Sequence, residues 1–372
     1  MDRFTITSTV FDAPQNGHKI AAKIYTPRRE ASDPGRGHVL TLLLVHAAGF
    51  HKEIWEPTLE TLPLDSTQIY DIKAESRNEQ TPRLHECEAY NNTNGYVSAV
   101  LRSAPTSNHY LGRWYINRIV AIDIFNHGDS FALNQSKLDR KLIARDLADV
   151  SRRVRSDSML VGVGHSLGAS IILTAQIVNP GLFDAIFAVE PILAPNPNFK
   201  QTFDHILKSR TVWKSERYAT KHVIDHPFYA TWDPRSHKVY LRYGLSPTEG
   251  PTAETQDGHT MTPAQALKPN CHSRDEFETY VGGWNECVWA IEHLREIICP
   301  TRFLTGQLSS VCPNPLFTKA YASSCFLSDA RVAKGLGHLI VMESPETTAH
   351  QMGIFLDDIL VVTNGLRMRS LI

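Results

Sequence analysis

The sequence predicts an α/β fold built on a doubly wound, mostly parallel sheet, with a helical cap inserted after the sixth strand. Short apolar runs recur at residues 41–45 (TLLLV), 119–124 (IVAIDI), 159–164 (MLVGVG) and 185–189 (AIFAV). Near-continuous apolar runs of this length are typical of strands that are buried on both faces. Segments with helical periodicity lie between them, which indicates right-handed strand–helix–strand crossovers.

Each element has its own local signal. The N-terminal stretch MDRFTITSTVFDAP alternates polar and apolar residues like a strand. Apolar residues at helical spacing predict helices over 52–62, 139–154 and 167–179. Asn179-Pro180-Gly181 ends the last of these helices. Residues 301–306 and 329–335 predict two further strands, and a closing helix is expected after Glu343.

Two segments interrupt the alternation and define the expected domains. Residues 65–117 are polar and lack sustained periodicity, so we expect a disordered or surface insertion there. Residues 192–298 are rich in Trp, Tyr, Pro and His and lie between two sheet strands, so we expect a helical cap over the mouth of the sheet. The core is then divided into residues 1–191, which contain the insertion, and residues 299–372.

Composition and charge exclude several classes of function. A formal net charge of −1 gives no sign of nucleic acid or an anionic membrane as a partner. No apolar run approaches the length of a membrane span, and the N-terminus lacks the apolar region of a signal peptide. The six cysteines show no metal-ligand spacing and are expected to be reduced thiols of an intracellular protein. They are Cys87, Cys271, Cys287, Cys299, Cys312 and Cys325.

Residues 164–168, Gly-His-Ser-Leu-Gly, form a G-x-S-x-G pattern between an apolar strand and an apolar helix. In this context the serine sits on a tight strand-to-helix turn, where bulky side chains at Gly164 or Gly168 would collide with neighbouring backbone. The hydroxyl projects at the carboxyl edge of the sheet, above a helix N-terminus that favours developing negative charge. Ser166 is therefore the predicted nucleophile, with a structural turn as the alternative.

A serine hydroxyl needs a base that takes its proton. Of the 17 histidines, His338 follows a predicted strand and a Gly-x-Gly turn in VAKGLGHLIVMESPE, and it comes after the serine in the chain. We expect it to act as general base and then as general acid. The alternative is a loop histidine with a capping role.

The oxyanion that forms when serine attacks a carbonyl group needs two N–H donors. One is expected to be the backbone of Leu167, the residue after the nucleophile. The other is expected from the loop after residues 41–45, whose small residues let backbone approach the substrate. Ala48 is the predicted donor there, with Gly49 or Phe50 as alternatives.

These motifs resemble the α/β-hydrolase superfamily. More narrowly, the chain resembles fungal secondary-metabolite hydrolases of the peroxisomal AK-toxin biosynthesis and mycophenolic acid acyl-CoA hydrolase type. The matching stretches are HAAGFHKEIWEP, AIDIFNHGDS, GHSLGAS, FDAIFAVEPI, HPFYATWDPR with YLRYGL, and GLGHLI. The resemblance covers most of 38–62 and 118–355. It implies an α/β-hydrolase fold and an enzyme of secondary metabolite or toxin biosynthesis that hydrolyses an ester or thioester, such as an acyl-CoA.

The resemblance also implies a peroxisomal location. The tail Ser370-Leu371-Ile372 departs from the usual peroxisomal signal because it lacks the basic middle residue. The cytoplasm is therefore the alternative.

The acid of the triad is not at its usual place in the sequence. Most enzymes of this fold carry it just after the strand that precedes the histidine strand, but residues 301–315 contain no carboxylate. Glu190 lies 24 residues after Ser166, at the carboxyl end of the predicted strand 185–189. It is the predicted acid, which would hold the imidazole of His338 and stabilise its positive form. Asp329 and the absence of any protein acid are the alternatives.

Three further groups of residues carry weaker signals. Asp123, His127 and Asp129 in DIFNHGDS are expected to be structural. The basic residues of the predicted cap could bind the phosphates of CoA, although a solvated helix face is favoured. They are Lys200, Lys208, Arg210, Lys214, Arg217 and Lys221. Aromatic residues of the same segment predict an apolar or aromatic acyl group. They are Trp213, Phe228, Tyr229, Trp232, Tyr240 and Tyr243.

The sequence thus predicts a serine hydrolase of the carboxylesterase or thioesterase type, which acts on a small-molecule acyl ester or thioester and needs no cofactor or metal. No nucleic acid partner is expected, and a homodimer is left open. One alternative is a non-hydrolytic cyclase, a transacylase or a C–C bond hydrolase on the same fold. Another is a ligand-binding pseudo-enzyme, against which the intact Ser–His pair argues.

Overall fold

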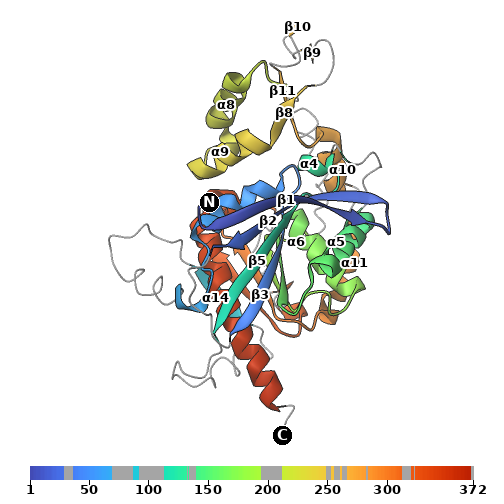
Figure 1. Cartoon of the computed structure of the whole chain (residues 1–372), viewed down its shortest axis with the longest axis vertical. Coiled ribbons are helices and arrows are strands. Elements are labelled where there is room, and N and C mark those ends of the chain that lie inside the picture. The colour runs from blue at the N-terminus through green and yellow to red at the C-terminus, as the bar shows by residue number, and fades with distance from the viewer. Residues whose placement is uncertain are drawn as a thin grey trace, which may run out of the picture.

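A twisted sheet flanked by helices on both faces forms the centre of the protein in the computed structural model (Figure 1). The structure describes residues 1–28, 37–68, 87–91, 113–131, 133, 140–193, 212–248, 253–254, 260–261, 266–281, 284–311, 320–321 and 323–369. Within these residues the sheet has nine strands in the order β1-β2-β5-β3-β6-β7-β12-β13-β4. The predicted α/β fold is therefore confirmed.

The middle of the sheet is parallel and its edges are antiparallel. The parallel strands are β5 (Trp114–Ile122), β3 (His38–Val45), β6 (Met159–His165), β7 (Ala185–Val189), β12 (Thr301–Gly306) and β13 (Ser328–Ala333). The antiparallel edge strands are β1 (Phe4–Ala13), β2 (His18–Pro27) and β4 (Cys87–Asn91). Each apolar run singled out in the sequence lies in or overlaps one of the parallel strands. Their carboxyl ends therefore meet at one edge of the sheet.

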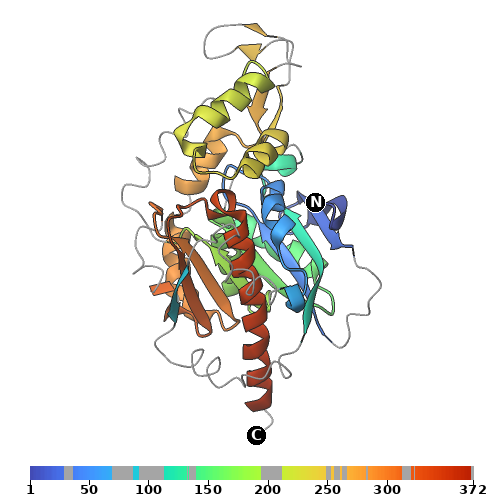
Figure 2. The ribbon, with the colours of Figure 1, turned by 90° about the vertical axis from the view of Figure 1, so that its left-hand side faces the viewer.

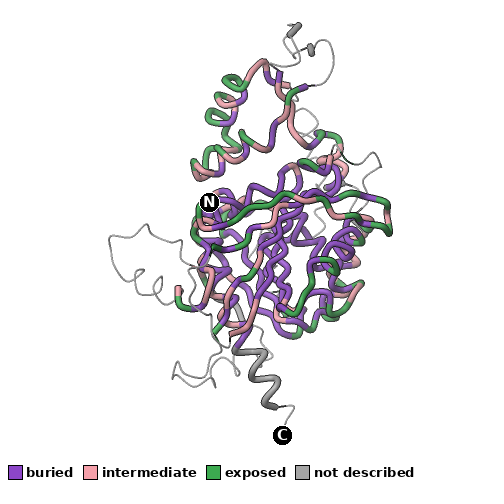
Figure 3. The backbone as a smooth tube through the Cα atoms, in the orientation of Figure 1, coloured by how far each residue is buried: buried purple, intermediate pink, exposed green. Residues whose placement is uncertain are grey.

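Two hydrophobic cores cover the two faces of the sheet. On one face, Leu43 and Val45 pack toward α5 (Arg140–Val154), α6 (Leu167–Val178) and α11 (Trp284–His293). On the other, Leu42 and Leu44 pack toward η1 (Lys52–Trp55), α1 (Glu56–Thr61) and the long α14 (Pro345–Arg369), which runs along the sheet in Figure 2. Successive β3 side chains thus enter opposite cores, which explains the unbroken apolar run. Figure 3 shows the inner strands as the buried centre of the molecule, whereas the edge strand β1 is largely exposed.

The segment between β7 and β12 supplies the elements that lie beyond the carboxyl edge of the sheet. These are α8 (Glu216–Asp225), η2 (Pro227–Tyr229), α9 (Pro234–Tyr243), β8 (Leu245–Pro247), β9 (Ala253–Glu254), β10 (Thr260–Met261), β11 (Leu267–Pro269) and α10 (Ser273–Val281). We call α8 to α10 the cap, and Figure 2 shows it above the sheet. By contrast, α11 and η3 (Leu294–Glu296) bury Ala290 and Leu294 in the same core as α6. The predicted cap at 192–298 therefore includes a part that packs as core.

Part of segment 65–117 belongs to the sheet, contrary to the expectation of a disordered or surface insertion. β4 pairs with β13 over residues 87–91, and β5 begins at Trp114. Trp114 and Ile116 are fully buried. These short strand segments were not predicted, because the sequence around them is polar and shows no strand pattern. Residues 69–86 and 92–112 lie outside the described residues.

No helix in the described part of the chain is both long and apolar enough to cross a membrane.

Candidate active site

Ser166 stands on a strained turn between β6 and α6. Its φ of +55° is one of three positive values at residues other than glycine in the described chain. A Cβ added to Gly164 would lie 2.5 Å from the Ala169 nitrogen, and one added to Gly168 would overlap the Val45 carbonyl oxygen. These clashes confirm the steric reason expected for the two glycines. The Ser166 N–H donates to the Val189 oxygen at 2.8 Å, which ties the turn to β7.

The structure brings Ser166, His338 and Glu190 into one hydrogen-bonded chain. The Ser166 hydroxyl lies 2.9 Å from Nε2 of His338, and Nδ1 of the same ring lies 2.8 Å from Oε2 of Glu190. Ser166 and Glu190 are fully buried, whereas 15% of the His338 side chain is exposed. With Nδ1–H donating to Glu190, Nε2 of the neutral ring is left as the acceptor of the serine proton.

Glu190 is held by donors from the region where the sequence lacks a carboxylate. Its Oε1 accepts from the Gly306 N–H at 2.5 Å, and its Oε2 accepts from the Ser309 hydroxyl at 2.7 Å. Its own N–H donates to the Leu304 oxygen, and its φ is +50°. The loop after β12 therefore supplies hydrogen bonds to the acid instead of supplying the acid itself.

Asp329, the alternative acid, lies elsewhere. It is the second residue of β13, at the amino edge of the sheet. Its carboxylate accepts from two nitrogens of Arg302 at 2.7 and 2.6 Å and pairs with Arg331 at 3.0 Å. Arg302 also pairs with Asp358 of α14 at 2.8 Å. Asp329 is thus part of a buried ion-pair cluster that joins β12, β13 and α14.

Two residues that the sequence analysis left without a role hold the His338 loop. Nε2–H of His165, the variable residue of G-x-S-x-G, donates to the His338 carbonyl oxygen at 2.9 Å. Burial, and then the nearby charge of His338, lowers the pKa of His165 to about 3, so this ring stays neutral. The Glu343 carboxylate accepts from the N–H groups of Gly337 at 2.7 Å and Leu339 at 3.0 Å. In the sequence, Glu343 marks only the residue after which the closing helix is expected.

Of the three candidate donors in the loop after β3, Ala48 is the one whose N–H has no acceptor among the described residues. His46 shapes the loop: its Nδ1–H donates to the Ala47 oxygen at 2.7 Å, and its Nε2 accepts from the Ile124 N–H at 3.0 Å. The Phe50 N–H donates to Ala47 and the Gly49 N–H hydrogen-bonds the Cys271 sulfur. No described residue accepts from the Ala48 N–H. The geometry thus favours Ala48 over the two alternatives, although its role as a donor stays a prediction.

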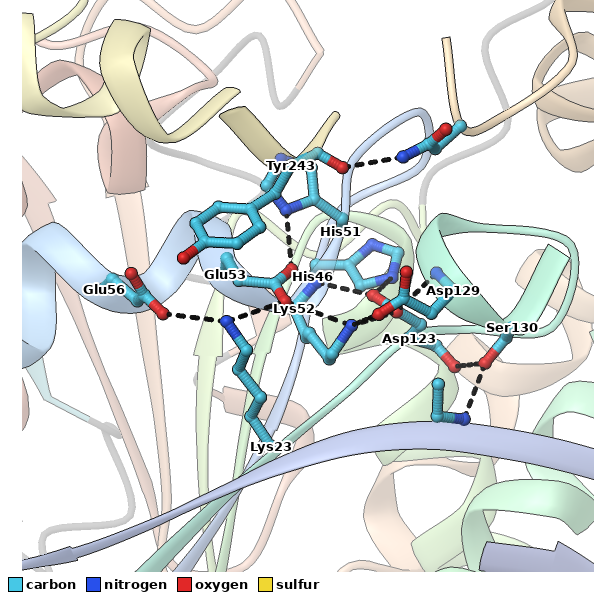
Figure 4. Close-up of polar contacts among 12 residues, drawn as sticks. Lys23, His46, His51, Lys52, Glu53, Glu56, Asp123, Asp129, Ser130 and Tyr243 are labelled. Atoms are coloured by element: carbon cyan, nitrogen blue, oxygen red, sulfur yellow. Dashed lines mark hydrogen bonds and ion pairs between the residues drawn. The ribbon is translucent and has the colours of Figure 1, made fainter. Parts of the chain in front are cut away.

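A mostly buried charged network lies beside this loop (Figure 4). The ammonium group of Lys52 contacts Asp123 at 2.7 Å, Asp129 at 2.6 Å and Glu53 at 3.1 Å. Burial alone would lower the pKa of Lys52, but the carboxylates of Asp123 and Glu53 outweigh it and raise that pKa. Asp123 also accepts from the backbone of Lys52 and of Asp129. Asp123 and Asp129 thus have the structural contacts that the sequence analysis expected.

His127 is also placed as a structural residue. It is fully buried, its Nδ1–H donates to the Phe125 oxygen at 3.1 Å, and burial lowers its pKa to about 4. Among the described residues, no group of three or more His, Cys, Asp or Glu is placed to hold a metal ion.

Part of the aromatic set of the cap packs directly on the loop after β3. The Phe50 ring lies 5.6 Å from that of Trp232 and 6.0 Å from that of Tyr240. Tyr229 lies 4.9 Å from Trp232 between centroids. The other predicted members are placed differently, because Trp213 packs inside the cap, Phe228 is 46% exposed, and Tyr243 covers the ammonium group of Lys23.

The basic residues of the cap are only partly described. Lys221 pairs with Asp225 at 2.7 Å on the exposed side of α8. Lys200, Lys208 and Arg210 lie outside the described residues.

Comparison with known proteins places this geometry in context. The chain is 24% identical over 230 residues to the Type I acyl-CoA thioesterase mpaH of Penicillium roqueforti (strain FM164), covering 58% of this chain and 42% of that protein. It is 21% identical over 283 residues to the peroxisomal membrane protein LPX1 of Saccharomyces cerevisiae, covering 69% and 70%. The chain thus spans less than half the length of the thioesterases that it matches.

Solved structures share the fold at low identity. The peroxisomal alpha-beta-hydrolase Lpx1 from Saccharomyces cerevisiae matches with a TM-score of 0.71 at 15% identity, covering 97% of this chain and 91% of that chain. E-2-(acetamidomethylene)succinate hydrolase matches with a TM-score of 0.62 at 16% identity, covering 95% and 100%. The sequence model of the alpha/beta hydrolase family matches residues 42–351. The chain therefore belongs to the alpha/beta hydrolase family.

Proposed function

We propose that this protein is a serine hydrolase that cleaves an ester or thioester bond through an acyl-enzyme on Ser166. One observation carries the proposal: the hydrogen-bonded chain from Ser166 through His338 to Glu190, with distances of 2.9 and 2.8 Å. Each member is aligned for its step, because the serine faces the ring nitrogen that is free to take a proton.

The reaction follows from this arrangement. As Oγ of Ser166 attacks the carbonyl carbon, Nε2 of His338 takes the serine proton. The tetrahedral intermediate collapses, the C–O or C–S bond breaks, and His338 gives its proton to the departing alkoxide or thiolate. A water molecule then loses a proton to His338 and attacks the acyl-enzyme. The carboxylic acid leaves, and Ser166 regains its proton.

Three groups lower the barriers of both steps. Glu190 keeps Nδ1 protonated and stabilises the imidazolium that forms. The N–H groups of Ala48 and Leu167 bind the oxyanion, and each such donor contributes about 10²–10³-fold to kcat. His165 and Glu343 are positioning residues, because they fix the backbone of the His338 loop.

The substrate is an acyl ester or thioester with an apolar or aromatic acyl chain. The aromatic contacts of Phe50, Trp232 and Tyr240 above the loop support an apolar acyl site. The relatives that are named acyl-CoA thioesterases support a thioester. The resemblance of the sequence motifs to fungal secondary-metabolite hydrolases is the basis for proposing a role in secondary metabolism. The relative named as a peroxisomal protein supports a peroxisomal location.

Acyl transfer to an acceptor other than water is the second candidate. Ser166, Ala48 and Leu167 are at most 1% exposed, so the reacting groups lie below the protein surface. An acyl-enzyme in such a site would last longer before hydrolysis, which favours attack by a hydroxyl of the acyl chain itself or of a bound acceptor.

A fluorophosphonate probe tests the central claim. The wild type should be labelled, and Ser166→Ala should not. Thr174→Ala is a matched control, since it removes a hydroxyl from α6, the helix that follows Ser166. Among the described residues this hydroxyl bonds only to the Ser170 oxygen. Equal labelling of wild type and Ser166→Ala, or none of either, would refute the proposal. Product analysis with ester and thioester substrates then separates the free acid of hydrolysis from the cyclised or transferred product.

A further inference from the structure

A carboxyl group that the proposed mechanism does not use lies against the loop that holds Ala48. Glu276 belongs to the first turns of α10, which lies at the cap end of the molecule in Figure 1. A Cβ added to Gly49 would lie 2.7 Å from Oε1 of Glu276 and 3.1 Å from Oε2. Both carboxyl oxygens therefore rest on the bare backbone of Gly49, the residue next to Ala48. The Gly49 φ of +81° favours glycine as well.

The surroundings of Glu276 are aromatic and uncharged. The Tyr240 hydroxyl donates to that of Tyr229, and the charge of Glu276, after burial, contributes to the raised pKa of both tyrosines. In the described part of the chain, no ion pair or hydrogen bond engages the carboxyl oxygens of Glu276. Burial raises the pKa of Glu276 to about 7. The side chain nevertheless keeps part of its accessible surface.

A carboxyl group without a partner in such a place is costly for the folded protein. Desolvation of an unpaired carboxylate opposes folding unless another group provides the missing hydrogen bonds. No cation or N–H donor of the described chain provides them. The carboxyl group instead neighbours Tyr240. The Tyr240 ring packs on the loop residue Phe50, with ring centroids 6.0 Å apart, so the carboxyl group lies beside the proposed acyl site.

We propose that Glu276 is a specificity-determining residue, which binds a hydroxyl group on the acyl chain of the substrate. This inference rests on the proposed function, because it assumes an acyl group bound at Ser166. Adjacent Cα atoms are about 3.8 Å apart, so the carboxyl group lies about one residue beyond the proposed Ala48 donor. A hydroxyl about two to four bonds from the reacting carbonyl carbon would reach it. The preferred substrates are therefore hydroxyacyl esters or thioesters and not plain hydrocarbon chains.

The test compares two thioesters that differ by one hydroxyl. Hexanoyl and 3-hydroxyhexanoyl thioesters of N-acetylcysteamine are hydrolysed at pH 8, where Glu276 is mostly ionised, and the ratio of their kcat/KM values is measured for each variant. The wild type should prefer the hydroxyacyl thioester by about tenfold or more, the worth of a hydrogen bond to a charged group. Glu276→Met should bring the ratio close to one. Glu276→Gln, which keeps a weaker acceptor, should give an intermediate ratio.

Glu278→Gln is the matched control, since it removes a carboxylate from the same helix whose partner is Arg274 on the surface. Its ratio should equal that of the wild type. The inference would be overturned if the wild type gave a ratio near one, or if Glu276→Gln gave the same ratio as the wild type. If Glu276→Met does not fold, the result for Glu276→Gln decides alone. Fluorophosphonate labelling separates the two levels: an unlabelled wild type refutes the proposed function and this inference with it, whereas a labelled enzyme with equal turnover refutes the inference alone.

Discussion

Replacement of Glu190 by glutamine should keep the fold and nearly abolish turnover. The carboxylate accepts three hydrogen bonds, from Gly306 N–H, the Ser309 hydroxyl and Nδ1–H of His338. An amide has one oxygen and one NH₂ group at these places. If the NH₂ group faces Gly306, two donors meet and the imidazolium loses its anionic partner. If it faces His338, the ring adopts the other tautomer, and Nε2–H can no longer take the Ser166 proton.

Either orientation removes the stabilisation that the acid gives to the transition state. We expect kcat to fall by about 10³–10⁴-fold, which corresponds to about 4–5.5 kcal/mol of activation free energy. The loss of folding stability should be smaller, about 1–3 kcal/mol, because one buried N–H group or one hydrogen bond is affected.

The assay measures kcat and KM with p-nitrophenyl esters and the rate of fluorophosphonate labelling, beside thermal unfolding of both proteins. KM should change little, since Glu190 does not contact the substrate in the proposed mechanism. A folded Glu190→Gln enzyme that keeps more than about a tenth of the wild-type kcat would refute the assignment.

Three further predictions address the surrounding groups. Asp329→Asn should lower the free energy of unfolding by about 3–5 kcal/mol, because it leaves Arg302 buried with a weaker partner. The kcat of the folded enzyme should stay near the wild-type value, and a large loss of kcat at full stability would contradict this. Glu343→Gln should lower kcat by about tenfold, because His338 is then positioned less firmly. The KM for short esters should not change, and the pH–rate profile should. An unaltered kcat would show that the His338 loop does not need the Glu343 hydrogen bonds. Because the pKa of Glu276 is raised to about 7 from an ordinary 4.5, the unfolded state loses this proton first as pH rises. The free energy of unfolding should therefore fall between about pH 4.5 and 7, by up to about 3 kcal/mol, and stay level above that range. Chemical denaturation of wild type and Glu276→Gln at pH 5 and pH 7 measures it, and equal slopes in the two proteins would count against the shifted pKa.

Much of the fold could be predicted from the sequence because its determinants are local. The apolar run of residues 185–189 coincides with β7, and residues 301–306 coincide with β12. The elbow of Ser166 was also readable, since the clash that excludes a side chain at Gly164 involves Ala169, only five residues away. By contrast, β4 was missed because five residues in a polar segment carry too weak a pattern, and their pairing with β13 is a tertiary contact.

The sequence by itself determined which residues are available for chemistry: Ser166, His338, and Glu190 by elimination, since residues 301–315 contain no carboxylate. Only the tertiary structure decided how they are held. Glu190 and its donor Gly306 are 116 residues apart, and His165 meets the His338 carbonyl across 173 residues. Glu276 reaches Gly49 only because the cap folds back over the sheet edge. A local sequence pattern predicts strands, turns and helices, because these depend on residues that are near in sequence. Contacts between distant segments exist only once the sheet has assembled.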